Sequence, residues 1–174
     1  MNAPGPWVWI IVGLVAAQRL AEMFHARRNT RRLLDEGGVE SGAGHYPLMV
    51  GLHVAWLASI LIHVAPDTPI HWPFLIAYLI VQGFRAWVLA SLGRFWTTRV
   101  ITVPGLPLVR RGPYRFFRHP NYMVVVAEIA ILPLVFGAWE IALVYSVLNG
   151  AMLVHRIRVE NRALSSRQEV PEAR

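Results

Sequence analysis

Residues 72–92, WPFLIAYLIVQGFRAWVLASL, form a continuous apolar stretch that contains a single charged residue, Arg85. A helix needs about 20 mostly apolar residues to cross the hydrocarbon core of a bilayer, and this stretch has that length and composition. It therefore predicts a transmembrane helix. Four further apolar stretches approach the same pattern, at residues 7–24, 46–64, 122–136 and 139–154.

The last two stretches are shorter than the others and are separated only by Gly137 and Ala138. They predict a short, tight helical hairpin, and a re-entrant pair that does not cross the bilayer is the alternative. The predicted fold is an all-α integral membrane protein of about five transmembrane helices in one domain, residues 1–174. Its expected parts are three N-terminal spans at 1–92, a long cytoplasmic loop with the hairpin and a C-terminal motif at 93–164, and a polar tail at 165–174.

The composition favours a membrane protein. Hydrophobic residues make up 55% of the chain and the mean hydropathy is +0.43, above what is usual for soluble domains. All 17 basic residues are arginines, placed between the apolar stretches, which fits a membrane surface better than nucleic acid, so no nucleic-acid partner is expected. The chain has no cysteine, which excludes disulfides, thiolate metal sites and a cysteine nucleophile.

The distribution of the arginines predicts the orientation in the membrane. Four lie between the first and second stretches, six between the third and fourth, and five after the fifth, whereas the connections at 65–71 and 137–138 contain none. Because positively charged loops stay in the cytoplasm, we expect the N-terminus outside and the C-terminus inside a bacterial cytoplasmic membrane. Trp7, Trp72 and Trp139 lie near the arginine-free ends, as interfacial anchors do.

Charged side chains inside transmembrane stretches are costly, and they are usually paired or functional. Arg19 and Glu22 lie three residues apart on one face of the first helix and predict an ion pair. Arg85 and Glu128 either pair with each other or line a cavity, and we expect both to bind substrate; snorkelling to the interface is the alternative for Arg85. The spacing of histidines and carboxylates indicates no metal site.

The connection at 93–121 is long for a link between two helices and is rich in aromatic and aliphatic residues, which favours a functional loop over a disordered one. It runs into G-P-Y-R-F-F-R-H-P-N-Y, residues 112–122. His119 precedes Pro120, which favours an extended residue at a helix start, and the free amides and positive dipole end there suit a carboxylate. A loop that anchors on anionic lipid is the alternative.

A second cluster, H-R-I-R-V-E-N-R-A-L, occupies residues 155–164. Arg156 and Glu160 lie four residues apart, so a helix places both side chains on one face. The residues alone are consistent both with a ligand site and with a solvated, charged helix end.

Together the two clusters resemble the isoprenylcysteine carboxyl methyltransferase family, whose pattern is G-P-Y-x-x-x-R-H-P-x-Y and, after a helical hairpin, R-I-x-x-E-E-x-x-L. The stretch L-G-R-F-W-T-T at 92–98 resembles the one leading into that family's cofactor region. A bacterial subgroup is more similar still, sharing blocks such as G-H-Y-P-L-M-V-G-L-H at 44–53 and V-I-T-V-P-G at 100–105. Some of its members are associated with type III polyketide synthases and methylate alkylpyrone or alkylresorcinol lipids.

The resemblance implies an O-methyltransferase that uses S-adenosyl-L-methionine, releases S-adenosyl-L-homocysteine, holds no metal and acts on a lipid acceptor. His119, Arg156 and Glu160 would be the catalytic residues, with Arg156 orienting the acceptor oxygen. Trp96 would bind substrate together with Arg85 and Glu128. The residues expected to hold the cofactor are Leu108, Val109, Gly112, Tyr114, Arg118, His119, Pro120, Tyr122 and Glu160.

Two departures from the family pattern bear on the substrate. The second Glu of the family is Asn161 here, and the tail at 165–174 lacks a Gly–Glu–Tyr element common in the family. The acceptor stays open among a prenylcysteine carboxylate, an alkylpyrone and an alkylresorcinol, and a type III polyketide synthase is a candidate functional partner. Two alternatives to a methyltransferase are an NADPH-dependent reductase of the membrane sterol type, which carries a similar R-H-P-N-Y block, and a non-enzymatic membrane scaffold.

Overall fold

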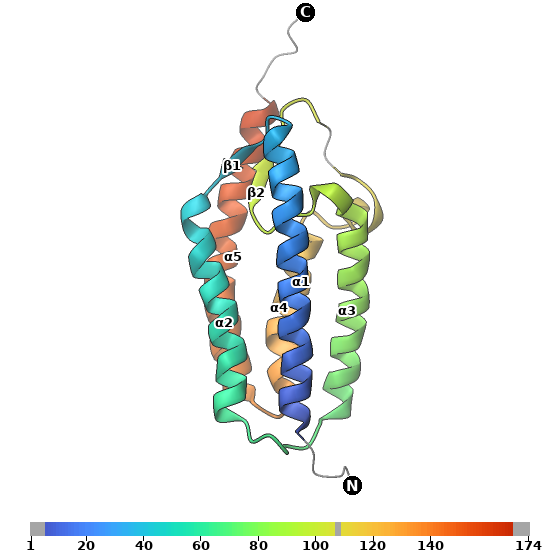
Figure 1. The fold of residues 1–174 in the computed structure, drawn as a ribbon, viewed down its shortest axis with the longest axis vertical. Helices are drawn as coiled ribbons and strands as arrows, with labels where there is room; N and C mark the ends of the chain where they lie inside the picture. The colour runs from blue at the N-terminus through green and yellow to red at the C-terminus, as the bar shows by residue number, and fades with distance from the viewer. Residues whose placement is uncertain (1–5, 107–108, 169–174) are drawn as a thin grey trace, which may run out of the picture.

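The computed structural model describes residues 6–106 and 109–168, which form one elongated helical bundle (Figure 1). In this view α1 lies in front of α4, α2 and α3 lie on either side, and α5 lies behind α2. The bundle begins with α1 at one end, and α5 finishes at the other. Its helices are α1 (Trp7–Asp35), α2 (Tyr46–His63), α3 (Trp72–Leu92), α4 (Pro120–Leu134) and α5 (Trp139–Gln168).

Among the described residues, three helices are long and apolar enough to cross a membrane: α1, α2 with the turn before it, and α3 with the turn after it. Their outer faces carry large apolar side chains, and Leu14, Ile62 and Ile80 are 67%, 75% and 69% exposed. Apolar surface on this scale is the kind that a bilayer covers. The protein is therefore a predominantly helical membrane protein, as predicted, while five spans and their orientation stay predictions.

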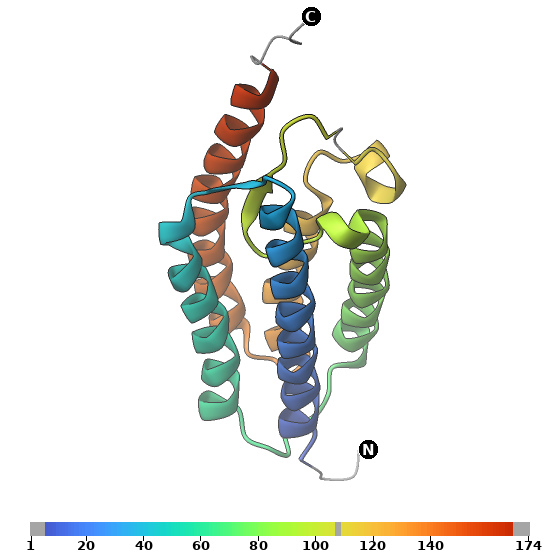
Figure 2. The same ribbon diagram turned by 45° about the horizontal axis from the view of Figure 1, so that its top comes forward.

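The predicted hairpin is formed by α4 and α5, which are joined at residues 135–138, but its second helix is not short. α4 has 15 residues and at 1.5 Å per residue is about 22 Å long, less than the ~30 Å core of a bilayer. α5 has 30 residues and continues through the second cluster, because residues 155–168 contain no Pro or Gly and are rich in helix-forming Arg, Glu and Leu. Figure 2 shows that α5 projects beyond the other helices at its C-terminal end.

A small antiparallel sheet joins two connections that are far apart in the sequence. β1 (Val39–Ser41) follows α1, and β2 (Val100–Thr102) lies in the long connection, with Val39 opposite Thr102 and Ser41 opposite Val100. The structure is predominantly helical, as predicted, but the prediction did not include this sheet, because three-residue strands are too short to show the alternation that marks a strand. Residues 6–106 and 109–168 also form three short 3₁₀ helices: η1 (Ala43–His45), η2 (Gly93–Phe95) and η3 (Gly112–Arg115).

The bundle interior changes character along its axis. At the end where α1 begins and α4 finishes, apolar side chains such as Val12, Ile60 and Leu132 pack into a core and are at most 1% exposed. A charged layer formed by Arg19, Glu22, Arg85 and Glu128 lies next. Beyond it, β2 and the ends of α1, α3 and α5 surround a cavity. The apolar end gives the helices a common core, and the opposite end is free to carry a polar site.

Candidate active site

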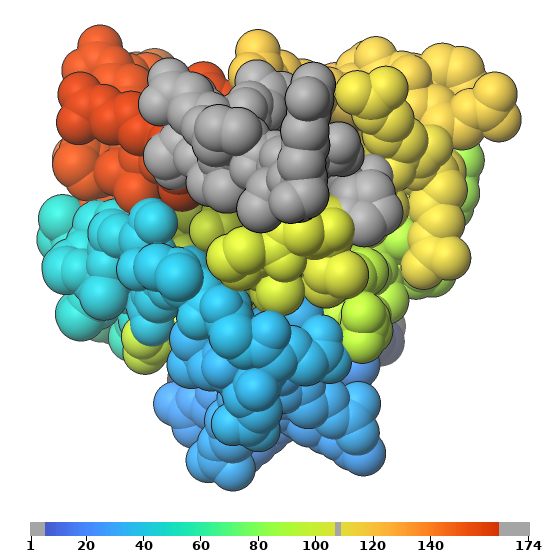
Figure 3. Space-filling model, turned by 90° about the horizontal axis from the view of Figure 1, so that it is seen from above, coloured from blue at the N-terminus to red at the C-terminus, as the bar shows by residue number. Residues whose placement is uncertain are grey.

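The cavity lies at the end of the bundle where α1 and α3 finish and α4 begins. Its volume is about 360 Å³, within the usual range for small-molecule sites. Seen from above, β2 and its flanks lie between the end of α1 and the end of α5 (Figure 3). The described residues that line the cavity are Leu33, Leu92, Phe95, Trp96, Thr97, Arg99, Val100, Ile101, Thr102, Val103, Leu106, Val109, Tyr114, Arg118, His119, Asn121, Tyr122, Arg156, Glu160 and Asn161.

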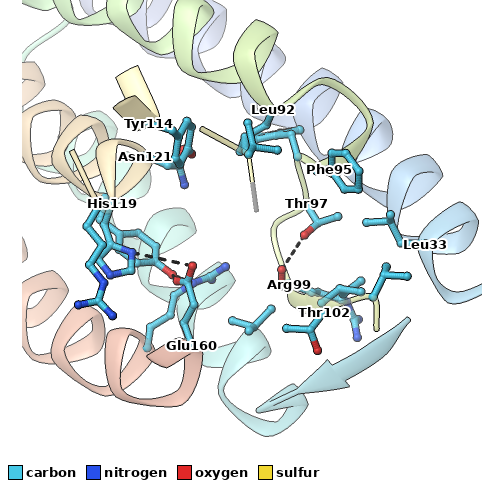
Figure 4. A pocket seen from close by; sticks show the side chains of 18 of the residues that line it. Leu33, Leu92, Phe95, Thr97, Arg99, Thr102, Tyr114, His119, Asn121 and Glu160 are labelled. Carbon is cyan, nitrogen blue, oxygen red and sulfur yellow. Dashed lines mark hydrogen bonds and ion pairs between the residues drawn. The ribbon is translucent and has the colours of Figure 1, made fainter. Parts of the chain in front are cut away.

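The two sequence clusters meet on one wall of this cavity. His119 precedes the first turn of α4, and Glu160 points toward it from α5 (Figure 4). The Nδ1 of His119 is 3.9 Å from Oε1 of Glu160, and the His119 ring stacks on Tyr122 with centroids 5.3 Å apart. The Tyr122 hydroxyl donates a hydrogen bond to Oε2 of Glu160. The structure thus brings together three of the residues predicted to hold the cofactor.

Arg156 lies on the same face of α5, one turn before Glu160, and is 6% exposed. Its Nε donates to the Tyr122 hydroxyl at 3.1 Å, and one terminal nitrogen donates to the carbonyl oxygen of Thr98 at 2.7 Å. The other terminal nitrogen is 2.6 Å from the sulfur of Met49 in α2. These contacts fix the plane of the guanidinium at the cavity wall and tie α2, the long connection and α4 to α5.

The other residues predicted to hold the cofactor divide into two groups. Val109, Tyr114 and Arg118 line the cavity, as His119, Tyr122 and Glu160 do. Gly112 and Pro120 are not among the lining residues; Pro120 is buried at the start of α4, and Gly112 lies against α3. Leu108 lies outside the described residues.

Gly112 has a packing role that makes it sensitive to substitution. Its φ is +57°, and a Cβ there would overlap the Ser91 hydroxyl and come within 3.2 Å of the Trp87 indole nitrogen. We expect Gly112→Ala to lower the free energy of unfolding by about 2–3 kcal/mol, from left-handed strain plus overpacking. Gly105→Ala is the matched control: its φ is +77° with nothing within 4 Å, so only the backbone strain of about 1–2 kcal/mol applies. Unfolding in detergent measures both, and equal losses would contradict the packing role.

Arg85 and Glu128 lie together in the middle of the bundle and do not line the cavity. Arg85 donates to Oε2 of Glu128 at 2.9 Å and also forms an ion pair with Glu22. Arg19 bridges the same two carboxylates, at 2.9 Å to Glu22 and 2.8 Å to Glu128. The predicted Arg19–Glu22 pair is therefore present within a neutral group of four charges. Binding of substrate by Arg85 and Glu128 stays a prediction.

Several buried polar atoms at the cavity have no hydrogen-bond partner within the described part of the chain. They are Nε1 of Trp96, Nε2 of His119 and the side-chain oxygens of Asn121 and Asn161. Since buried polar groups are normally paired, a ligand with both donors and acceptors would satisfy them. S-adenosylmethionine, with its amino, carboxylate, hydroxyl and adenine groups, fits this set. Asn121 was missed by sequence reasoning, although it lies within the motif at 112–122.

Charge in the cavity is predominantly positive. Arg99, Arg118 and Arg156 line it, against a single carboxylate, Glu160, among the described lining residues. Arg99 is itself paired with Glu40 of β1 at 2.7 Å. Burial, and then the negative charge of Glu160, raise the pKa of Tyr114 above its usual value, so its hydroxyl stays a neutral donor at physiological pH. Within residues 6–106 and 109–168 no group of three or more His, Asp or Glu side chains is placed to hold a metal.

Comparison with known proteins identifies two relatives and the family of this chain. A curated relative from Bacillus subtilis (strain 168), uncharacterized protein YpbQ, is 38% identical over 160 residues, covering 90% of this chain and 95% of that protein. An uncharacterized protein from Haemophilus influenzae is 25% identical over 164 residues, covering 90% of this chain and 94% of its own length. No solved structure matches the chain. The model of the isoprenylcysteine carboxyl methyltransferase (ICMT) family matches residues 74–166, and the chain therefore belongs to this family of membrane methyltransferases.

Proposed function

We propose that this protein is an S-adenosylmethionine-dependent O-methyltransferase that methylates the polar head of a membrane lipid at the cytoplasmic face. The observation that carries the proposal is the cavity wall on which His119, Tyr122, Arg156 and Glu160 converge from the two motifs of the family. The unpartnered polar atoms around it support a ligand with several donors and acceptors.

Methyl transfer from S-adenosylmethionine mainly requires that donor and acceptor be aligned, because the methyl group is already activated. When bound, S-adenosylmethionine supplies a methyl group on a sulfonium, which an acceptor oxygen takes by in-line displacement. Glu160 contributes a negative charge that favours a cationic ligand in an otherwise basic cavity. Arg156, fixed by Thr98 and Tyr122, is placed to hold an anionic acceptor oxygen by charge-assisted hydrogen bonds. For a neutral phenol, His119 or Glu160 would accept the proton.

The membrane helices and the distribution of arginines support a reaction at the cytoplasmic face. The connections rich in arginine lie at the end of the bundle that carries the cavity, and such connections stay in the cytoplasm, where S-adenosylmethionine is available. We therefore propose a bacterial cytoplasmic membrane with the N-terminus outside and the C-terminus inside. A lipid acceptor would keep its chain in the bilayer while its head meets the donor in the cavity.

We propose a prenylcysteine-type carboxylate, an alkylpyrone or an alkylresorcinol as acceptor. The blocks at 44–53 and 100–105 that resemble the polyketide-associated subgroup favour the last two. A type III polyketide synthase would then produce the substrate. Radiolabelled methyl transfer to a panel of these three lipids distinguishes them.

The cofactor can be tested without knowing the acceptor. Calorimetry on the purified protein in detergent is expected to show S-adenosylhomocysteine binding and no NADPH binding. Tyr122→Phe is expected to weaken S-adenosylhomocysteine binding about tenfold. It removes the hydrogen bond to Glu160, which we propose holds the cofactor. Binding of NADPH alone would favour a reductase, and binding of neither, with no phenotype for Tyr122→Phe, would favour a scaffold.

A further inference from the structure

The indole of Trp96 is buried beside the cavity without a hydrogen-bond partner in the described chain. The residue follows η2, is 3% exposed and lines the cavity. Its Nε1–H has no hydrogen-bond partner among the residues that the structure describes. A buried indole N–H usually finds a partner, because otherwise the hydrogen bond that it made with water is lost. Trp56 is likewise buried and unpartnered but lies in the apolar core, whereas Trp96 lines the cavity, where a bound ligand can supply the acceptor.

The backbone that carries Trp96 is held by Asn29 of α1, which is 2% exposed. Its side-chain nitrogen donates to the carbonyl oxygens of Gly93, at 3.1 Å, and of Trp96, at 2.9 Å. Both partners are acceptors, so the amide nitrogen, and not its oxygen, must face them. Asn29 thus stabilises η2, the turn that follows α3, from a different helix, and adds to the hydrogen bond that the Trp96 N–H already donates to the Gly93 carbonyl at 3.1 Å.

The ring of Trp96 is held by His25, one turn earlier on α1. The His25 and Trp96 rings stack with centroids 5.8 Å apart and an interplanar angle of 22°. The nitrogen of Asn29 lies 3.2 Å from Nε2 of His25. α1 thus contributes a two-residue clamp, in which Asn29 fixes the backbone of Trp96 and His25 covers one face of its indole. Neither clamp residue is among those that line the cavity.

We propose that the indole N–H of Trp96 donates a hydrogen bond to bound S-adenosylmethionine, and that Asn29 and His25 are positioning residues that hold the indole for it. The inference rests on the proposed function and assigns further residues to the same site. S-adenosylmethionine offers carboxylate and ribose oxygens as acceptors, and S-adenosylhomocysteine retains both. The clamp residues would act on the cofactor only through Trp96.

Indole N–H resonances of the ¹⁵N-labelled protein in micelles test the contact directly. Addition of S-adenosylhomocysteine is expected to shift the Trp96 resonance downfield, since a new hydrogen bond deshields the proton. The resonance is assigned by its loss in Trp96→Phe, or by elimination with Phe variants of the other six tryptophans should that variant fail to fold. Trp96→Phe is expected to weaken binding about tenfold. Trp56→Phe is the matched control, because Trp56 is 1% exposed, its Nε1 is also unpartnered in the described chain, and it lies in the apolar core.

The clamp is tested by variants that keep or remove its two contacts. Asn29→Asp removes both donors with little change in shape, and His25→Ala removes the stacked ring; each is expected to weaken S-adenosylhomocysteine binding and to reduce the shift of the Trp96 resonance. His25→Phe keeps a stacked ring and is expected to retain both the S-adenosylhomocysteine affinity and the shift of the Trp96 resonance. No binding to the wild-type protein would overturn the proposed function. Wild-type binding with an unshifted Trp96 resonance and full affinity in Trp96→Phe would overturn this inference alone. The methyl-accepting substrate would then be the candidate partner of the indole.

Discussion

Glu160→Gln is expected to lower kcat/KM for methyl transfer about 100-fold or more, because it removes the charge that balances a cationic donor in a basic cavity. Glu160 is the single carboxylate among the described residues that line the cavity, which also contains Arg99, Arg118 and Arg156. The substitution keeps the size of the side chain and an oxygen that still accepts from Tyr122. The expected loss is therefore one of charge and not of shape.

The charge dependence of this effect gives a sharper test than activity alone. S-adenosylmethionine carries a sulfonium and S-adenosylhomocysteine does not, so Glu160→Gln is expected to weaken binding of the first more than that of the second. Calorimetry with both ligands measures the difference. Glu140→Gln, an exposed position in the first turn of α5, serves as the control and should change neither affinity. Equal losses for the two ligands would show that Glu160 acts through hydrogen bonds only, and unchanged affinities would refute its assignment to the cofactor.

The parts of this site that could be predicted depend on residues that lie close together in the sequence. His119, Pro120 and Tyr122 follow one another in a motif, and the four-residue spacing of Arg156 and Glu160 requires only that a helix continue through them. The proximity of these two groups was implied by the family resemblance, and the structure brings His119 within 3.9 Å of Glu160. The apolar stretches predicted the helices of the bundle for a similar reason, since length and composition are local properties.

The parts that could not be predicted depend on contacts between segments that are far apart in the sequence. Asn29 bonds to Trp96, 67 positions away, and a polar residue in an arginine-rich helical segment gives no sign of its partner. β1 and β2 pair across the bundle end, but strands of three residues carry no periodic signal. The charged layer shows both cases: the Arg19–Glu22 pair follows from spacing, whereas the ion pair of Arg85 with Glu22 spans 63 positions and was not foreseen.

The second large effect is expected in that charged layer, where Glu128→Gln should lower the free energy of unfolding by about 3–5 kcal/mol. The Glu128 side chain is 2% exposed and accepts from Arg19 at 2.8 Å, from Arg85 at 2.9 Å and from Gln82 at 2.7 Å. The four charges are balanced, so neutralising one carboxylate leaves an excess cation deep in a helical bundle that a bilayer surrounds. Denaturant unfolding in micelles measures the loss.

Removing one charge of each sign distinguishes charge balance from simple loss of contacts. Arg85→Met combined with Glu128→Leu leaves Arg19 paired with Glu22, at 2.9 Å, and fills the vacated space with apolar side chains. Because a buried ion pair replaced by apolar groups of similar volume is often neutral in stability, the double variant is expected to be more stable than either single one. Glu36→Gln breaks the exposed Arg94–Glu36 pair, whose side chains are 52% and 40% accessible, and as a control should cost under about 1 kcal/mol. A double variant that is as unstable as the sum of the singles would contradict charge balance. If it folds and binds S-adenosylhomocysteine but transfers no methyl group, the predicted role of Arg85 and Glu128 in binding the acceptor gains its first direct support.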